Sequence, residues 1–130
     1  PYTVIGSDGE LAGTHPRGFG SFARFLGHYI RERKAVGLEE GVRKMTSLSA
    51  SQAGIAKRGL IEAGYYADLV LFDPESVIDR STSAEPHAVS VGIDKVWVNG
   101  DLVYVEGQTT GARPGMPVRR NPQLVDGPEK

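Results

Sequence analysis

The sequence predicts an α/β portion followed by a mainly β portion, and three observations carry this prediction. A short β-prone run, residues 3–5, is followed at once by a polar turn that contains Asp8. Apolar residues at helical spacing extend from residue 22 to residue 45. After residue 57 the spacing changes to short apolar runs and an Asn-Gly turn, which are typical of strands. We therefore place the portions at residues 1–56 and 57–120, followed by a disordered tail over residues 121–130.

Composition excludes several classes of protein. The chain has 130 residues, which suits one ordinary domain, and its formal net charge is −1 without long runs of either sign. Nothing in this charge pattern favours nucleic acid or a membrane surface as a partner. No apolar run approaches the roughly 20 residues of a membrane span, and the absence of Cys excludes disulfides. We expect a cytoplasmic protein and, since the chain starts at Pro1 without Met, a fragment of a larger one.

The acid with the most suggestive setting is Asp8, directly after the first β-prone run. A (β/α) barrel places its chemistry at the carboxyl ends of its strands, so residues 3–5 are interpreted as a last, buried barrel strand. Asp8 would then be a general base that takes a proton from metal-activated water and returns it to a leaving group. The alternative is an ordinary turn or cap aspartate, because Asp is common in turns.

The glycine-rich loop over residues 10–20 carries His15 and Arg17. The planar guanidinium of Arg17 suits a carboxylate, and His15 could contact a substrate or support a neighbouring group. Both could equally be exposed loop residues without a function. The histidines do not have the spacing of a zinc pair, and one carboxylate with one His falls short of the three protein ligands usual for catalytic zinc.

Three helices are expected in the first portion. Ser21 is a candidate cap for a helix over residues 22–35 that packs along an aromatic stripe of Phe22, Phe25 and Tyr29. A shorter helix is expected around Leu38, Val42 and Met45, after Gly37. Ser49 followed by Gln52 has the form of a capping box and predicts the start of a third helix.

The second portion predicts strands. Residues 60–61 and 69–72 are short apolar runs, which we interpret as strands buried on both faces. Residues 95–98 and 101–105 flank Asn99-Gly100, the two-residue turn typical of a β-hairpin. In that register Trp97 opposes Leu102 and Val96 opposes Val103, so both hairpin faces are apolar and need a cover. An extended, proline-containing tail follows residue 107.

The order of these motifs resembles the carboxyl-terminal part of the D-aminoacylases (N-acyl-D-amino-acid deacylases) of the amidohydrolase superfamily. The spacing from Ser7-Asp8-Gly9 to His15-Pro16-Arg17 narrows the resemblance to this group. The resemblance continues almost to residue 120 through residues 38–46, residues 57–61, Gly64, residues 67–74, residues 96–100 and residues 111–115.

The resemblance implies a (β/α)8 barrel with one or two zinc ions and a small β-sandwich built from both chain ends. It identifies Asp8 as a catalytic and metal-binding residue, with Ser7, His15 and Arg17 near the substrate. The intact enzyme would hydrolyse N-acyl-D-amino acids. This chain alone would be inactive, hold zinc weakly and self-associate through exposed apolar surface. The alternatives are another amidohydrolase reaction, such as cyclic-amide opening, or a non-catalytic binding or assembly module.

Overall fold

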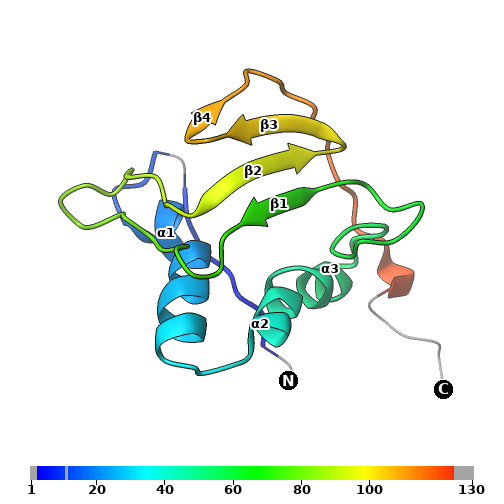
Figure 1. The fold of residues 1–130 in the computed structure, drawn as a ribbon. Helices are drawn as coiled ribbons and strands as arrows, with labels where there is room; N and C mark the ends of the chain where they lie inside the picture. Colours follow the sequence, from blue (N-terminus) through cyan, green and yellow to red (C-terminus); the bar gives the residue numbers. More distant parts are fainter. Residues whose placement is uncertain (1–2, 11, 125–130) are drawn as a thin grey trace.

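The computed structural model describes residues 3–10 and 12–124, and places an antiparallel sheet beside a group of helices (Figure 1). The sheet has four strands in the order β1-β2-β3-β4, with β1 on the side of the helices. The elements are α1 (Arg17–Arg24), η1 (Phe25–Glu32), α2 (Leu38–Met45), α3 (Ser47–Ala53), β1 (Leu69–Phe72), β2 (Ile93–Val98), β3 (Asp101–Val105), β4 (Gln108–Thr109) and η2 (Pro122–Leu124).

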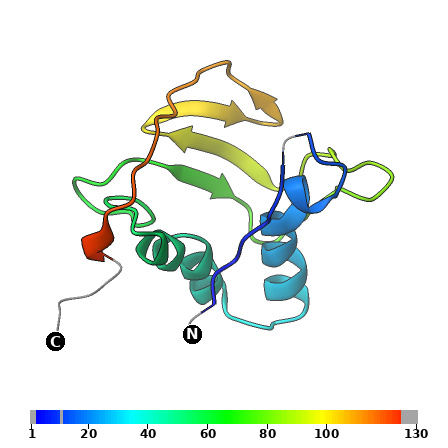
Figure 2. The same cartoon turned by 180° about the vertical axis from the view of Figure 1, so that it is seen from behind.

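The first described segment, residues 3–10, has no regular secondary structure and runs past the helices (Figure 2). Lys44 on α2 anchors it by donating from Nζ to the carbonyl oxygen of Thr3 at 2.8 Å. The predicted strand over residues 3–5 is therefore wrong, and Val4 is 37% exposed instead of buried. A strand exists only when a neighbour completes its hydrogen bonds, and the strands in residues 12–124 pair with one another instead.

The first helix begins earlier than expected. The backbone of Pro16 is already helical, with φ −59°, so α1 starts at Arg17. Ser21 does not cap the helix; it lies inside it and donates from Oγ to the carbonyl oxygen of Arg17 at 2.8 Å. The helix continues directly into the π-helix η1, which ends at Glu32.

The buried face of this long helix also differs from the predicted aromatic stripe. Phe22 and Tyr29 are each 46% exposed, whereas the buried hydrophobic residues are small or aliphatic ones. Those residues contact Val77, which is only 1% exposed, and together they form the centre of the core. The core cluster consists of Ala23, Leu26, Ile30 and Val77, with Phe25, Val36, Leu38, Val42, Met45, Phe72 and Ile93 packed around it. Residues before and after residue 57 thus share this cluster.

Two shorter helices, α2 and α3, come next in the chain. The structure confirms the predicted second helix as α2, and α3 begins at Ser47 instead of Ser49. The capping box is wrong, because Ser49 Oγ donates to the carbonyl oxygen of Lys44 at 2.7 Å from within the helix. Gly54 ends α3 with φ 69°, a left-handed conformation that glycine adopts without strain.

The predicted hairpin is confirmed. Asn99 and Gly100 both have positive φ, 51° and 90°, as a two-residue turn between twisted strands requires. Trp97 pairs with Leu102 as expected. Val96, however, pairs with Tyr104 instead of Val103, because the register shifts at a bulge between Val96 and Trp97.

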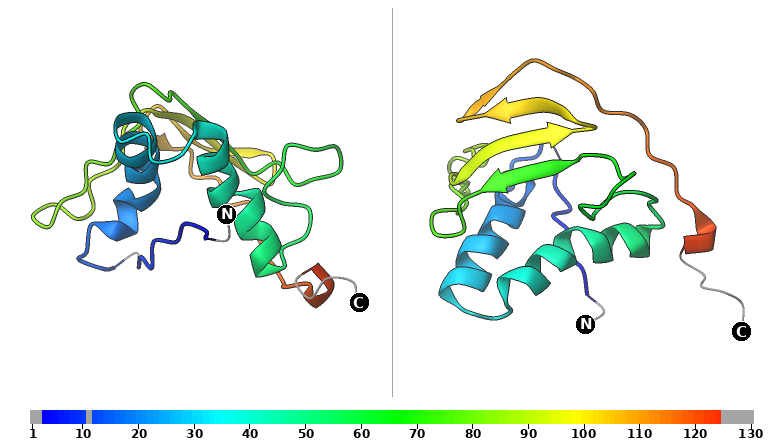
Figure 3. Two further views of the ribbon diagram at one scale, coloured as in Figure 1. Left: turned by 90° about the horizontal axis from the view of Figure 1, so that it is seen from below. Right: turned by 45° about the vertical axis from the view of Figure 1, so that its right-hand side comes forward.

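The remaining β predictions need correction. Residues 60–61 form no strand, and Ile61 is 93% exposed. The predicted strand over residues 69–72 is confirmed as β1, but it is not buried on both faces, since Val70 is 55% and Leu71 is 49% exposed. Figure 3 shows β1 at the edge of the sheet, next to the helices.

The tail is more ordered than expected where it is described. After residue 110 it is largely extended, and residues 122–124 form a short 3-10 turn. The N–H of Asn121 donates to the carbonyl oxygen of Gly54 at 2.7 Å, which attaches the tail to the end of α3. Residues 125–130 of the expected disordered tail lie outside the described residues. No helix among the described residues has the length and apolar character needed to cross a membrane.

Candidate functional site

The candidate site is built on Ser7, Asp8 and Gly9, a short backbone segment here called the bend after the positive φ of Asp8. The Oγ of Ser7 accepts a hydrogen bond from the N–H of Gly9 at 3.2 Å, which closes the bend. Asp8 at its centre has φ 48°, in the left-handed region that Asp tolerates better than most residues. The Asp8 side chain is 89% exposed.

The bend lies against the start of α1 through two glycines. A Cβ atom on Gly9 would lie 2.4 Å from the Cα of Gly18, a separation that real contacts do not show. The two backbones thus approach more closely than any side chain would allow. This contact brings Asp8 to the first turn of α1, where Arg17 begins the helix.

Arg17 binds Asp8 at two points. Its Nη2 lies 2.9 Å from the Oδ2 of Asp8, and its Nε donates to the backbone carbonyl oxygen of Asp8 at 2.9 Å. The Arg17 side chain is 48% exposed, so water screens the ion pair and its contribution to stability is small. The guanidinium thus contacts one carboxylate oxygen and one backbone carbonyl oxygen of the same residue.

His15 lies beside Arg17 and supports the start of the helix. Its Nδ1 accepts a hydrogen bond from the backbone N–H of Arg17 at 3.1 Å. A nitrogen that accepts a hydrogen bond carries no proton, so the neutral ring has its proton on Nε2. The structure therefore brings all four predicted site residues, Ser7, Asp8, His15 and Arg17, into one small region.

This cluster offers a carboxylate, a guanidinium and an imidazole, which can move a proton and bind an anionic group. It does not make a complete metal site. Across residues 3–10 and 12–124 there is no group of three or more His, Cys, Asp or Glu side chains placed to hold a metal ion. Asp8 could supply one ligand, while catalytic zinc usually takes three protein ligands.

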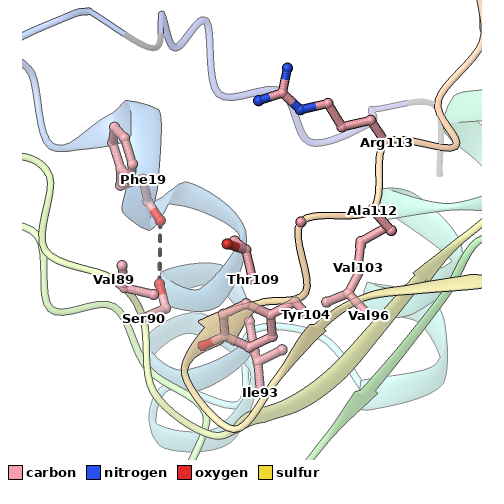
Figure 4. Close-up of a pocket in the computed structure, with 11 residues that line it drawn as sticks. Phe19, Val89, Ser90, Ile93, Val96, Val103, Tyr104, Thr109, Ala112 and Arg113 are labelled. Atoms are coloured by element: carbon pink, nitrogen blue, oxygen red, sulfur yellow. Dashed lines mark hydrogen bonds between the residues drawn. The ribbon is translucent and has the colours of Figure 1, made fainter.

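A separate hollow of about 540 Å³ lies between the start of α1 and the end of the sheet (Figure 4). None of the four predicted site residues lines it. Its wall is mainly apolar, with the side chain of Arg113 extending beside it. The lining residues are Phe19, Val89, Ser90, Ile93, Val96, Val103, Tyr104, Thr109, Gly111, Ala112 and Arg113. The Asp8 cluster is the candidate site, because a carboxylate, a guanidinium and an imidazole lie together there.

Sequence reasoning missed the residues that hold this cluster in place. Ser81 is a buried polar residue, and its Oγ donates to the carbonyl oxygen of Pro16 at 2.9 Å. Gly20 makes room for it, since a Cβ atom there would lie 2.3 Å from the Ser81 Oγ. No local pattern could reveal this contact, because its partners are far apart in the sequence.

The chain matches known proteins over the part that contains this cluster. The model of the amidohydrolase family matches residues 3–104. The chain is 48% identical over 118 residues to the N-acyl-D-aspartate deacylase of Alcaligenes xylosoxydans xylosoxydans, a match that covers 88% of this chain and 24% of that protein.

Solved structures of deacylases also match this chain. The crystal structure of a D-aminoacylase matches with a TM-score of 0.87 and 45% identity, over 91% of this chain and 25% of that one. The N-acyl-D-glutamate deacylase of Bordetella bronchiseptica, in complex with zinc and a phosphonate inhibitor, matches with a TM-score of 0.69 and 48% identity, over 72% of this chain and 20% of that one. The chain thus spans about a quarter of the length of these relatives.

Proposed function

Because the chain belongs to the amidohydrolase family, we propose that it forms part of a metal-dependent hydrolase that cleaves the N-acyl amide bond of N-acyl-D-amino acids. The observation that carries this proposal is the meeting of Asp8 with Arg17. This pair occurs in a chain whose relatives and structural neighbours include deacylases of N-acyl-D-amino acids.

In this proposal Asp8 is the group that transfers the proton. Its carboxylate accepts a proton from the attacking water as the new C–O bond forms at the amide carbon. It then gives that proton to the amine nitrogen as the C–N bond breaks, which releases a carboxylate and a D-amino acid. The high exposure of the Asp8 side chain leaves it accessible to a substrate.

Arg17 is proposed to bind the carboxylate of the substrate, with His15 and Ser7 beside it. Support comes from its present partner, since its Nε and Nη2 already bind Asp8. A substrate carboxylate would compete with Asp8 for this fork. Substrate binding would therefore release the Asp8 carboxylate from its ion pair and leave it free to accept a proton.

The finer architecture is also a proposal. Residues 3–56 would complete the end of a (β/α)8 barrel, and residues 57–120 would form part of a small β-sandwich. The similarity to the D-aminoacylase crystal structure supports this arrangement, as does the antiparallel sheet that follows the helices. The extended residues 3–8 would then gain strand partners from chain beyond the described residues.

We further propose that the intact enzyme holds zinc and that Asp8 is one of its ligands. The zinc in the deacylase from Bordetella bronchiseptica supports the choice of metal. The described residues alone do not suffice for such a site, because they bring together no three suitable side chains. The other ligands would come from residues outside the described part of the chain.

The test compares this chain with a protein of the relatives' length that contains it. Both are assayed on N-acyl derivatives of D-Asp, D-Glu and D-Leu, on the L-enantiomers and on cyclic amides. We expect D-selective hydrolysis by the longer protein and its loss in the Asp8→Asn variant. Asp101→Asn, at an exposed acid on β3, is the matched control. Preferred cleavage of cyclic amides, or near-normal turnover in Asp8→Asn, would contradict the proposal.

We also infer that the 130-residue chain associates with itself. The side chains of Val70 and Leu71 on β1 are exposed, and exposed apolar surface favours contact with another copy. A compact monomer at all concentrations would contradict this inference.

A further inference from the structure

The loop formed by residues 79–90, here called the clamp loop, lies beside the start of α1 (Figure 1). An antiparallel bridge joins its two ends. The N–H of Ile78 donates to the carbonyl oxygen of Val91 at 3.2 Å, and the N–H of Val91 donates back to Ile78 at 3.0 Å. The loop is therefore closed at its base and presents a defined surface to the helix.

Three side chains of the clamp loop bind three backbone carbonyls of the segment that carries His15 and Arg17. His87 Nε2 lies 2.9 Å from the carbonyl oxygen of Gly13, Ser81 Oγ donates to that of Pro16 at 2.9 Å, and Ser90 Oγ donates to that of Phe19 at 3.3 Å. Figure 4 shows the last of these bonds. These anchors come before, between and after His15 and Arg17, so both residues are held from each side.

The middle of the contact is tightly packed. Ser81 is 8% exposed and fits only because Gly20 has no side chain. Next to it the Asp79 carboxylate, whose side chain is 9% exposed, pairs with Arg24 at 3.3 Å. The clamp loop is thus attached to α1 by packed contacts as well as by hydrogen bonds.

His87 anchors the part of the segment that comes before α1 and has no regular secondary structure. Its ring lies against the ring of Phe19, with 5.0 Å between the centroids and 52° between the planes. The carbonyl oxygen of Gly13 can only accept, so His87 Nε2 must carry the proton and donate. Gly13 is followed by no regular structure until α1, and glycine resists order because it has many conformations to lose.

We propose that His87 is a positioning residue, which acts through the backbone of residues 13–17 to orient Arg17 and His15. This inference rests on the proposed function, because it takes Arg17 as the group that binds the substrate carboxylate. Small displacements of a positioning group can cost up to about a hundredfold in rate. A fixed Gly13 carbonyl thus keeps the guanidinium fork where it can meet Asp8 and, by the same geometry, a substrate.

The test uses a protein of the relatives' length that contains this chain. Two variants separate the effect of the His87 ring from the effect of its hydrogen bond. His87→Phe keeps a ring on Phe19 but loses the donor, whereas the amide of His87→Gln replaces the donor. We expect His87→Phe to raise KM about fivefold to tenfold with a smaller effect on kcat, and His87→Gln to recover most of the loss. His28→Phe, which removes a histidine paired with Glu32, is the matched control and should leave KM unchanged.

Hydrogen exchange supplies a readout that does not depend on activity. The amides of Gly18, Phe19 and Gly20 are bonded within the anchored segment, and we expect His87→Phe to speed their exchange about fivefold while β2 amides stay unchanged. Ser81→Ala should act in the same way, with exposed Ser83→Ala as its control, and it replaces His87→Phe if that variant fails to fold.

The outcomes distinguish the two hypotheses. Faster exchange without any deacylase activity in the parent protein would refute the proposed function and would limit His87 to holding the backbone of residues 13–17. Unchanged exchange and unchanged KM in His87→Phe would overturn the inference. Equal losses in His87→Phe and His87→Gln would also overturn it, because the hydrogen bond would then have no part in the effect.

Discussion

Arg17 binds Asp8 through both the carboxylate and the backbone carbonyl oxygen, with 2.9 Å for each contact. One residue begins α1 and the other lies at the centre of a bend with positive φ, so this pair joins two separate local structures. The pair is exposed, and its geometry is more important for what it can bind than for stability.

Replacing Arg17 by Lys should weaken substrate binding. Lys keeps the charge but has no Nε–H and no planar fork, so it cannot reproduce both contacts with a carboxylate. In the protein of the relatives' length we expect KM for N-acyl-D-amino acids to rise about tenfold. The free energy of unfolding should change by less than about 1 kcal/mol, because the ion pair is exposed. Steady-state kinetics and urea denaturation measure the two effects.

Arg33→Lys, at an exposed residue after η1, is the control and should leave both quantities unchanged. A normal KM in Arg17→Lys would exclude the role of this fork in substrate binding.

Replacing Gly9 by Ala should destabilise the bend that carries Asp8. The added Cβ would lie 2.4 Å from the Cα of Gly18, which belongs to the backbone and cannot rotate away, so one segment must move. We expect a loss of about 1–3 kcal/mol in the free energy of unfolding, typical of forced overpacking. Chemical denaturation followed by circular dichroism measures it.

Gly6→Ala is the matched control, because a Cβ atom at Gly6 would meet nothing within 4 Å. Equal stability of the Gly9 and Gly6 variants would show that the Gly9–Gly18 contact does not constrain the bend.

The turn after β1 should lose stability in acid. The Asp73 carboxylate accepts from Ser76 Oγ at 2.5 Å and from the N–H of Glu75 at 3.0 Å. These hydrogen bonds, first that from Ser76 and then that from Glu75, hold the pKa of Asp73 below its usual value of 3.8, with a smaller contribution from the charge of Arg31. A lowered pKa in the folded state means that the stabilisation is present above pH 3.8 and is lost as the pH falls through the folded value.

Asp73→Asn should therefore be less stable than the parent chain at pH 7, and this difference should shrink below pH 3.8. Thermal unfolding at the two pH values measures it. A difference that stays constant in acid would mean that the Asp73 charge makes no contribution.

Placing a charge on the edge strand should reduce self-association. Val70 on β1 is 55% exposed, and a Lys there would oppose pairing with another copy. We expect Val70→Lys to lower the average molecular mass of the chain in solution, whereas Val70→Thr, which keeps the β-branched shape, should reduce it less. Sedimentation velocity measures the mass. If Val70→Lys associates as strongly as the parent chain, β1 is not the contact surface.

Local patterns in the sequence determined the hairpin and α2. Asn99-Gly100 requires only two residues that accept positive φ, and Leu38, Val42 and Met45 lie on one face of any helix. Two short motifs also supplied the four candidate site residues, Ser7, Asp8, His15 and Arg17, which the structure places in one region. Their roles stay a prediction. Strand pairing was harder to predict, since the bulge after Val96 shifts the partner of that residue by one position.

Only the tertiary structure determined which segments of the chain are in contact. Residues 3–5 have strand-forming side chains but form no strand, because a strand depends on hydrogen bonds from a neighbour and not on propensity alone. The contact of His87 with Gly13 joins residues that are 74 positions apart, and the Gly9–Gly18 approach joins the bend to the start of α1. Such contacts form only when packing of the core has brought the segments together. No local sequence pattern predicts them, because their partners come from different segments.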